Sequence, residues 1–331
     1  MLEGKTAHEV VKKVIAQVMI HGDKREIWGG TIPQKIGDPN SPTDFDRVMI
    51  EHEPMCFTLT NPLARWCDIS DHWVAITLRE TEDTLQGYNP GHIIKYSKLY
   101  PVWIESDGKF NYTYGERFLK YGHVPIDQVK NCIEILKKHP TTRKACINTW
   151  APSWDLFSNY VPCNVFFQLR IIDKKLQWTT VVRSLDVLRG LTENIFMFTI
   201  WQEYCASLLK VGLGEYTNVA LNPHLYQEQI DKDQHIIKVK DCYEFYNPKP
   251  AFETSFPSKE FVKIDHMVFD TRHISDAVEI VETLSPYWKN WKFALLAEWE
   301  RIHHQYVKAE EFSKRVTNEF GIGIRERLKK R

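Results

Sequence analysis

The chain has 331 residues, of which 43% are hydrophobic and 13% aromatic, which suits one large domain or two modest ones. It carries 43 lysine and arginine residues against 43 aspartate and glutamate residues, so its formal net charge is zero. This balance argues against a protein that attracts nucleic acids or membranes through a large net positive charge. No apolar run reaches membrane-spanning length, and we expect no signal peptide.

The seven cysteines are scattered, and none belongs to a Cys-x-x-Cys pair. An odd, unpatterned set at this chain length argues against a secreted disulfide scaffold and favours a reducing, cytoplasmic location. No cluster has the spacing of zinc ligands, and His303 and His304 lack partners, so we expect no metal site.

The N-terminal part predicts a helix, a strand and a loop. Apolar residues recur at helical spacing over residues 7–20. A turn that contains Arg25 leads into an expected strand at 26–32, interrupted by glycines. Residues 37–46 are rich in proline, aspartate, asparagine and serine, which predicts a loop.

Two further helices are expected before the middle of the chain. A short apolar run at 73–78 leads into a polar, acidic helical segment at 79–87. Residues 125–139 form a clear amphipathic pattern with lysines near the C-terminal end, where cations suit the helix dipole.

A hairpin of two buried strands is the clearest feature of the sequence. Residues 165–172 and 176–183 are apolar runs separated by the turn residues 173–175. Cys163 precedes the first strand and Arg183 ends the second. A cation near a thiol lowers the thiol's pKa and makes it a nucleophile. Without other information, a cysteine in this position is more often a small buried apolar residue than a nucleophile.

After the hairpin, residues 192–209 predict a long apolar helix. A strand is expected at 217–221, a turn at 222–226 and another strand at 235–246.

The C-terminal part predicts helices and a basic end. Apolar residues follow helical spacing over residues 275–314. The basic residues at 325–331 predict either a solvated helix end or a tail that contacts phosphate backbones.

Three blocks of sequence resemble the thymidylate synthase family, which includes the pyrimidine nucleotide hydroxymethylases of phages and antibiotic pathways. The blocks are residues 162–168, 183–195 and 224–226, in the family's order and near its spacing. The resemblance is clear over 100–231, weaker before, and absent after about residue 270.

The resemblance implies an α/β (α+β) thymidylate synthase-like fold, with a large mixed sheet packed by helices. We expect a catalytic domain at residues 1–270 and a helical C-terminal extension at 271–331. A homodimer is also implied, in which Arg143 and Lys144 cross to the partner's phosphate site. In the family an N-terminal arginine also binds this phosphate. Arg25 is the nearest candidate, and the alternative interpretation is that Arg25 is only a solvated arginine in a turn.

The resemblance assigns catalytic roles as well. Cys163 would add to carbon 6 of the pyrimidine, which activates carbon 5. Glu80 is placed by counting back from Gly87 and would order water and assist proton transfers, with Glu82 as the fallback. The residues assigned to catalysis are Cys163, Glu80, Tyr114, Asn194 and Arg183.

The nucleotide would be held by its phosphate, sugar and base. The residues assigned to it are Arg143, Lys144, Gln168, Arg183, Ser184, Asn194, His224 and Tyr226. An amide at Asn194 can donate to O4 and accept from N3–H, which suits uracil. Family members that use cytosine tend to carry an aspartate there.

The implied carbon donor is 5,10-methylenetetrahydrofolate, a co-substrate. The resemblance places Asp186, Tyr100 and Gly190 at the folate. Transfer leaves an exocyclic methylene group on the base, which hydride converts to methyl and water converts to hydroxymethyl.

Hydroxymethylation of dUMP is the interpretation we favour. Asn164 replaces the family's histidine after the cysteine, Tyr100 replaces a tryptophan, and a helical extension replaces the short apolar tail. Each change favours a wetter site.

The alternatives are methylation of dUMP to dTMP, hydroxymethylation of dCMP or CMP, or an idle homologue that binds nucleotides or nucleic acid. The choice between deoxyribose and ribose stays open.

Overall fold

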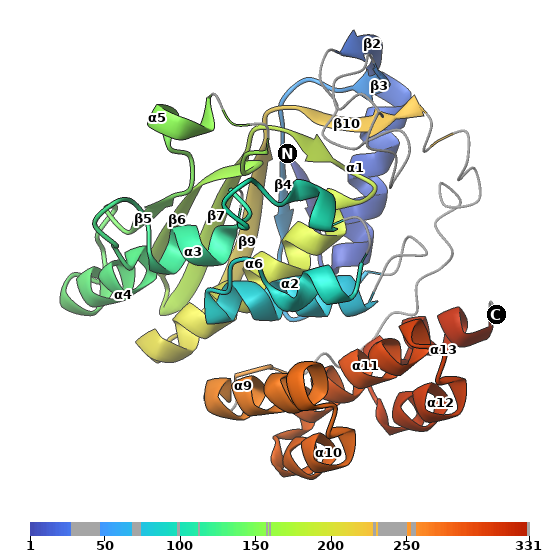
Figure 1. The fold of residues 1–331 in the computed structure, drawn as a ribbon. Helices are drawn as coiled ribbons and strands as arrows, with labels where there is room; N and C mark the ends of the chain where they lie inside the picture. The colour runs from blue at the N-terminus through green and yellow to red at the C-terminus, as the bar shows by residue number, and fades with distance from the viewer. Residues whose placement is uncertain are drawn as a thin grey trace.

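The fold is mixed α/β, with two sheets and a helical layer at the C-terminal end (Figure 1). It is seen in a computed structural model. The residues that this structure describes are 1–27, 47–67, 74–97, 100–111, 113–156, 158, 160–227, 230, 250–252 and 256–329.

The larger sheet has six strands in the order β1-β4-β9-β7-β6-β5 and mixes parallel and antiparallel pairs. Its strands are β1 (Leu2–Gly4), β4 (Met55–Leu59), β9 (Gly212–Ala220), β7 (Lys175–Val182), β6 (Asn164–Ile172) and β5 (Cys146–Asn148).

The predicted hairpin is confirmed as β6 and β7, which pair antiparallel. Asp173 and Lys174 connect the strands with φ values of 50° and 60°. Two consecutive residues with positive φ make a two-residue connection that matches the right-handed twist of the strands. The register therefore brings the start of β6 and the end of β7, which carry Cys163 and Arg183, to the same end of the sheet.

Helices cover one face of this sheet, and α6 (Gly190–Leu209) runs along its centre. The helix is apolar nearly all round because it lies between the sheet and other helices. Phe198 packs on Phe118 and Phe167, so helix and strand share one aromatic core. The neighbouring helices are α2 (Val74–Gln86), α3 (Tyr114–Leu119) and α4 (Gln128–Lys138). The short helices are α5 (Pro152–Asp155) and the 3-10 turns η1 (His92–Lys95) and η2 (Tyr100–Trp103).

The smaller sheet has the order β2-β3-β10-β8. Its strands are β2 (Asp23–Ile27), β3 (Arg47–Glu51), β10 (Pro223–Tyr226) and β8 (Leu185–Asp186). The turn predicted at 222–226 is wrong, because Pro223 begins a strand that pairs with β3 and β8. That segment is too short to show strand alternation.

The helices expected at 7–20 and 125–139 are confirmed as α1 (Ala7–His21) and α4. Thr6 caps α1 and Asp127 caps α4, each by accepting a backbone N–H of the first turn. The loop expected at 37–46, the strand expected at 235–246 and most of the strand expected at 26–32 lie outside the described residues.

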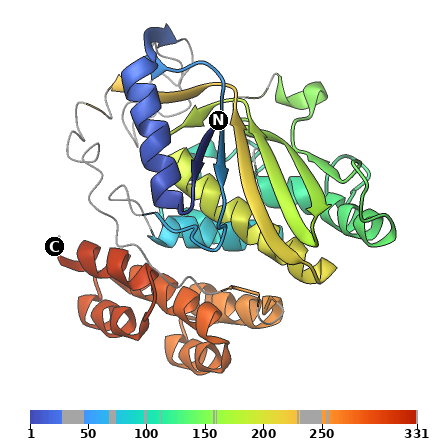
Figure 2. The same ribbon diagram turned by 180° about the vertical axis from the view of Figure 1, so that it is seen from behind.

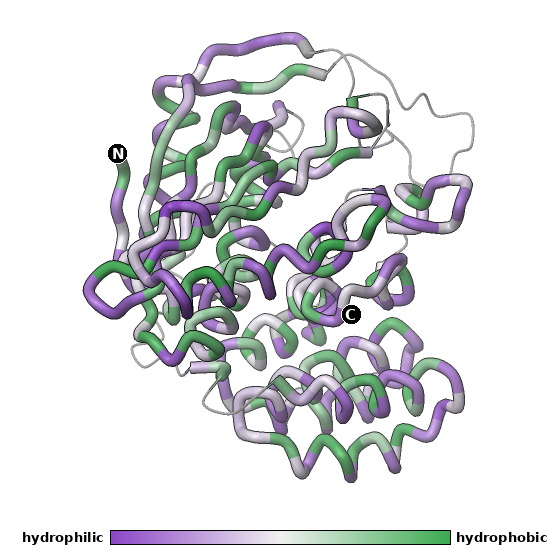
Figure 3. The backbone as a smooth tube through the Cα atoms, turned by 90° about the vertical axis from the view of Figure 1, so that its left-hand side faces the viewer, coloured by the Kyte–Doolittle hydropathy of each residue, from purple (hydrophilic) through white to green (hydrophobic). Residues whose placement is uncertain are grey.

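A layer of helices at the C-terminal end packs beneath α2 (Figures 1 and 2). Its elements are α9 (Ser258–His266), the π-helical turn η3 (Met267–Thr271), α10 (Ile274–Thr283), α11 (Pro286–Ile302), α12 (Tyr306–Arg315) and α13 (Phe320–Lys329). Hydrophilic and hydrophobic residues alternate along these helices, as expected of helices with one buried face (Figure 3). A helical C-terminal region is thus confirmed, and it begins before residue 270; the division into two domains stays a prediction.

A buried ion network joins this layer to α2. Arg79 contacts Asp83 at 2.9 Å and Asp265 at 3.1 Å, while Lys292 contacts Glu82 at 2.5 Å and Asp265 at 2.9 Å. All five residues are at most 4% exposed. Charges buried this deeply depend on one another, because losing one partner leaves an uncompensated charge in a medium of low dielectric constant.

Lys292→Met should therefore destabilise the protein by about 3–5 kcal/mol, because Glu82 and Asp265 lose a buried cation. Urea denaturation measures this loss. Lys289→Met is the matched control: Lys289 lies on the same helix but pairs with Glu282 at 3.1 Å near the surface, so its loss should cost under about 1 kcal/mol. Equal losses in the two variants would contradict a structural role for the network.

Candidate active site

Cys163 and Arg183 meet where the hairpin leaves the larger sheet. The half-buried Cys163 sulfur lies 3.8 Å from Arg183 Nη2. The Arg183 side chain also donates to the carbonyl oxygens of Pro162 at 3.1 Å and Val161 at 3.4 Å. Its backbone N–H donates to the carbonyl of Cys163 at 2.8 Å. One arginine therefore both fixes the cysteine loop and faces the sulfur.

The charge around this sulfur is balanced between opposing influences. Burial raises the pKa of the Cys163 thiol, the Arg183 guanidinium lowers it, and the Asp186 carboxylate raises it again. Burial acts by disfavouring the charged thiolate. The net shift is upward, so this protein without a ligand holds Cys163 mainly as a thiol, with the cation that can stabilise a thiolate already in place.

Two asparagines and a tyrosine lie next to the cysteine. Asn164 donates its amide to the Tyr114 hydroxyl at 2.8 Å and to Asn194 Oδ1 at 3.2 Å. Its backbone N–H also donates to Tyr114 at 3.2 Å. Burial and the nearby Cys163 raise the pKa of Tyr114, which therefore stays a neutral phenol. The contact to Asn164 orients the amide of Asn194, near the start of α6.

Glu80 approaches the same region from α2. The Tyr100 hydroxyl donates to Glu80 Oε2 at 3.0 Å. A cavity of about 20 Å³ lined by Glu80, Tyr100 and Tyr114, among others, is large enough for one water. The fallback residue Glu82 faces the opposite way, toward α11, where Trp291 and Lys292 contact it.

Asp186 and Gly190 lie where β8 leads into α6. Asp186 Oδ1 accepts the backbone N–H groups of Leu188 at 2.9 Å and Arg189 at 3.1 Å, which holds the turn. A side chain at Gly190 would meet only Leu185, 4.0 Å away, so the backbone is open there to a flat ring. Ser184, half-buried, lies between Arg183 and β8.

His224 and Tyr226 lie on β10, beside β8. Their rings are 5.0 Å apart, and His224 pairs with Asp186 in the register of the two strands. The sheet thus places His224 next to Asp186, whose carboxylate acts on Cys163, although the two strands are far apart in the sequence.

Three of the residues that the sequence analysis assigned to nucleotide binding lie away from Cys163. Gln168 donates to the carbonyl of exposed Arg143 at 3.3 Å, and exposed Lys144 follows before β5. Gln168 also lines a hollow of about 520 Å³ with polar residues of β7 and β9. Its neighbour Phe167 packs on Phe198 of α6, so Gln168 points to the opposite face of the sheet. Within one chain, these three residues are not brought to Cys163.

Arg25, the candidate for a phosphate-binding arginine, lies on β2. Its guanidinium contacts Glu51 at 3.2 Å and Asp23 at 3.5 Å, and its side chain is 53% exposed.

Glu193 is a residue of this region that the sequence analysis missed. Burial raises its pKa, and the carboxylates of Glu80 and Asp186 raise it further, so three acidic groups converge near Cys163. The available signal was an acidic residue directly before Asn194, at the start of an otherwise apolar helix.

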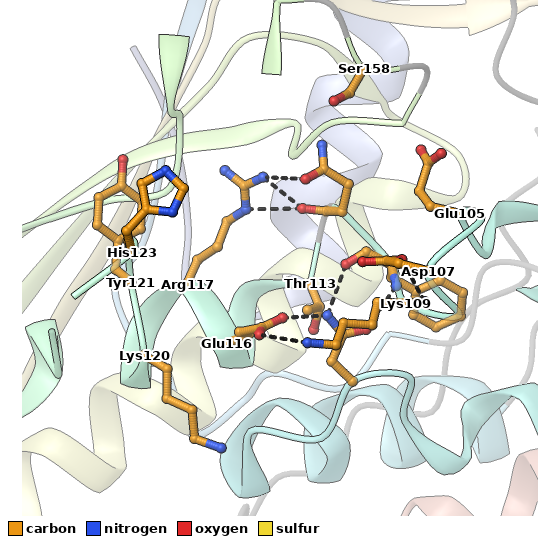
Figure 4. Close-up of a pocket in the computed structure, with 14 residues that line it drawn as sticks. Glu105, Asp107, Lys109, Thr113, Glu116, Arg117, Lys120, Tyr121, His123 and Ser158 are labelled. Atoms are coloured by element: carbon orange, nitrogen blue, oxygen red, sulfur yellow. Dashed lines mark hydrogen bonds and ion pairs between the residues drawn. The ribbon is translucent and has the colours of Figure 1, made fainter. Parts of the chain in front are cut away.

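A second missed group supports the cysteine loop from behind. Arg117 pairs with Asp155 at 2.6 Å, and Asn111 donates to the carbonyl of Tyr160 at 3.1 Å, three residues before Cys163. Arg117 and Asn111 border a polar cavity of about 510 Å³, in which Arg117 points to its partners and Lys120 points away (Figure 4). Sequence periodicity does not indicate such a network, because its members lie on separate elements.

Neither a membrane span nor a metal cluster is found in the described ranges. No helix in them is both long and apolar enough to cross a membrane. No three metal-ligating side chains in them are grouped to hold a metal ion.

Comparison with known proteins points to one family. The family model "Thymidylate synthase" matches residues 72–274, more than half of the chain. A protein of Methanosarcina mazei named "Putative thymidylate synthase" is 36% identical over 129 residues, 39% of this chain and 59% of the relative. Relatives of the same name from Methanosarcina acetivorans and Methanothermobacter marburgensis are 33% and 30% identical over 49% and 55% of this chain, and 73% and 79% of their own lengths. The match thus spans less than two thirds of the first relative.

The Glu80 carboxyl group should make stability depend on pH. Burial raises its pKa to about 7, against a partial lowering by the Tyr100 hydroxyl. In the unfolded chain the pKa is about 4.3, so the folded protein binds an extra proton between the two values and loses stability as pH rises through 7. Glu80→Gln, which stays neutral, should therefore gain stability relative to the native protein between pH 5 and pH 8.

Urea denaturation at the two pH values measures this difference. Glu279→Gln, on the exposed face of α10, controls for the general effect of removing a carboxylate. A difference between Glu80→Gln and the native protein that is constant with pH would contradict a raised pKa at Glu80.

Proposed function

Because this chain belongs to the thymidylate synthase family, we propose that it transfers a one-carbon group from 5,10-methylenetetrahydrofolate to carbon 5 of a pyrimidine nucleotide. The observation that carries the proposal is the contact between Cys163 and Arg183. Asn164, which follows Cys163 in the chain, also donates a hydrogen bond to Asn194. A nucleophile, a cation and a base-reading amide thus meet at one place, which suits covalent catalysis on a bound anion.

The covalent step is an addition to the pyrimidine ring. The Cys163 thiolate forms a bond to carbon 6, and the electron pair of the 5,6 double bond moves to carbon 5 and O4. Arg183 stabilises the thiolate before addition and, with Ser184, binds the 5′-phosphate. Departure of the sulfur at the end restores the double bond, so the cysteine is regenerated.

The base is a uracil in this proposal. Asn164 donates to Asn194 Oδ1, which leaves the Asn194 amide nitrogen directed elsewhere. In that orientation the nitrogen can donate to O4, while the oxygen keeps a second lone pair for N3–H. His224 and Tyr226 would hold the sugar hydroxyl.

The residues around Asp186 fit a folate. Asp186 would bind the pterin, the open backbone at Gly190 would leave room for its ring, and Tyr100 would contact the folate. The folate supplies the carbon as a methylene group. Glu80 and its one-water cavity would carry protons to and from the base.

Water completes the reaction in this proposal, giving 5-hydroxymethyl-dUMP and tetrahydrofolate. The cavity beside Glu80, which is large enough for one water, supports this outcome. The names of the relatives favour methylation, in which hydride from tetrahydrofolate gives dTMP and dihydrofolate.

A role without catalysis has less support. A homologue that only binds its ligand would have no use for the whole set of residues that match the family's motifs, which are Cys163, Arg183, Asp186, Asn194, His224 and Tyr226. Arg325 donates to the carbonyl of Ser313 at 3.0 Å, and Arg327 contacts Glu298 at 3.8 Å. These arginines of the basic end are therefore used within the fold, which does not favour nucleic-acid binding.

Incubation with dUMP and methylenetetrahydrofolate tests the reaction. We expect 5-hydroxymethyl-dUMP by mass spectrometry and no rise in dihydrofolate absorbance. A stoichiometric absorbance rise with dTMP as product would establish methylation instead. A covalent adduct with 5-fluoro-dUMP should form and be lost in Cys163→Ser; no adduct in the native protein would overturn the covalent mechanism. Parallel reactions with dCMP, UMP and CMP test base and sugar.

The protein acts as a homodimer in this proposal. The polar hollow over β6, β7 and β9 leaves part of a sheet face accessible, with Arg143 and Lys144 exposed at its edge. A second copy on this face would bring those two cations to the phosphate of its partner.

Mixing two inactive variants tests the crossing. If Arg143 binds the phosphate in the partner's site, the variants Arg143→Glu and Cys163→Ser should restore activity when they are mixed. A mixed dimer then has one site that contains both substitutions and one site that contains neither. Activity should return to about a quarter of the native value for random two-fold pairing. Cys163→Ser mixed with Asn194→Ala is the matched control and should stay inactive, since these residues share one chain's site. No recovery in the first mixture would contradict the crossing.

A further inference from the structure

A buried ion pair lies behind the cysteine loop. Arg117 of α3 contacts Asp155 of α5 at 2.6 Å, and the two residues are 5% and 1% exposed. The guanidinium also donates to the carbonyl oxygens of Thr149 and Asn111 (Figure 4). Acceptors thus lie on Nε, Nη1 and Nη2 of Arg117, which fixes the plane of the guanidinium where an unpaired charge would be costly.

The same pair holds the chain on both sides of Trp150. The carbonyl oxygen of the residue directly before Trp150 accepts from Arg117. The backbone N–H of the residue directly after it donates to Asp155 Oδ2 at 2.6 Å. The guanidinium carbon of Arg183 lies 5.8 Å from the centroid of the Trp150 ring. An aromatic face attracts a cation at this distance, so the place of the ring affects the place of the Arg183 side chain.

The pair is also tied to the cysteine loop itself. Asn111, whose carbonyl accepts from Arg117, donates its side-chain amide to the carbonyl of Tyr160 at 3.1 Å, three residues before the cysteine. The hydroxyl of Thr149 donates to the carbonyl of Asn164, directly after the cysteine. The backbone that carries the sulfur is therefore held on both sides.

We propose that Arg117 and Asp155 are positioning residues for the nucleophile, which act through the backbone and through Trp150 to keep the Cys163 sulfur in contact with the Arg183 guanidinium. That contact is 3.8 Å long. The reaction of the sulfur rests on the proposed function, whereas its placement rests on the contacts alone. The ion pair thus has a role in nucleophile activation at one remove from the sulfur.

The consequence of losing the pair is electrostatic. Burial raises the pKa of the Cys163 thiol, Arg183 lowers it and Asp186 raises it, while the neighbouring Tyr114 stays a neutral phenol. A Coulomb interaction weakens with distance, so a sulfur that has moved away from Arg183 has a higher pKa. Less thiolate is then present at a given pH, and this change precedes any binding of substrate.

The pH profile of Cys163 alkylation by iodoacetamide, followed by mass spectrometry of the peptide that contains it, tests the proposal without substrate. In Arg117→Met the apparent pKa of the thiol should rise by about 1, so that alkylation below that pKa slows about tenfold. The midpoint of the profile reports the charge around the sulfur, whereas easier access to it would change only the plateau at high pH. An unchanged midpoint would overturn the proposal.

A double variant separates placement of the sulfur from stability of the fold. Arg117→Met leaves the Asp155 carboxylate buried without its cation, which should lower the urea midpoint. Adding Asp155→Leu removes both charges, so the urea midpoint should recover toward the native value. The raised thiol pKa should persist, because the hydrogen bonds that hold both sides of Trp150 are still missing.

The double variant also keeps the proposal testable if the single variant does not fold. Recovery of the thiol pKa together with the urea midpoint would mean that the pair only stabilises the fold, and would overturn the proposal.

Arg65→Met is the matched control. Arg65 is 2% exposed and forms a buried ion pair with Glu203 of α6, and no contact in the described ranges ties it to the cysteine loop. Its replacement should lower the urea midpoint as Arg117→Met does, but leave the midpoint of the alkylation profile unchanged. An equal rise of the thiol pKa in the two variants would contradict a positioning role.

The covalent adduct with 5-fluoro-dUMP extends the test to the reaction. At saturating nucleotide, adduct formation should slow about tenfold in Arg117→Met and in the double variant, in proportion to the thiolate that remains. Arg65→Met should react at the native rate. Native rates in both Arg117 variants would overturn the proposal. A native protein that forms no adduct, but whose thiol pKa responds as expected, would refute the proposed function and support the placement of the sulfur by the ion pair.

Discussion

The candidate site depends on the way Arg183 holds the cysteine loop. Its guanidinium binds two backbone carbonyls of residues 161–162 and approaches the Cys163 sulfur at 3.8 Å. The same cation thus does two kinds of work, because carbonyl oxygens fix its position while its charge acts on the thiol. A phosphate bound by Arg183 would share this charge with the sulfur, so substrate binding and nucleophile activation are electrostatically linked.

Side chains close together in the sequence of helix α2 face two different parts of the structure. Glu80 faces Tyr100 and the one-water cavity, whereas its neighbours Arg79 and Glu82 face the ion network with the C-terminal layer. A helix turns by about 100° per residue, so adjacent side chains can lie on different faces. The polar composition of this helix is explained by the network, since the charges that would be unusual in a core helix are paired with Asp265 and Lys292.

Hydrogen-bond direction organises the other half of the site. The β10 strand places His224 between Glu51 and Asp186, two carboxylates on neighbouring strands. On one side His224 Nδ1 contacts the side chain of Asn222 at 3.0 Å, and on the other Asp186 fixes the turn into α6. Methylation and hydroxymethylation differ in whether hydride or water reaches the base.

The sequence by itself determined the elements whose signals are local. The hairpin at β6 and β7 and helices α1, α4 and α6 follow from apolar periodicity, turn residues and caps, which depend on neighbours along the chain. The blocks around Cys163, Arg183 and His224 also indicate one family by themselves, because each is a contiguous run of residues.

Only the tertiary structure decided which polar groups face one another. Glu193, the Arg117 network and the contacts of Asn222 join elements far apart in sequence, so periodicity carries no information about them. The segment 222–226 resembles a turn in sequence because so short a run shows no alternation, and its pairing with β3 and β8 makes it a strand. Likewise, Glu80 faces Tyr100 and Glu82 faces Lys292, because hydrogen-bond partners are set by packing in three dimensions and not by composition.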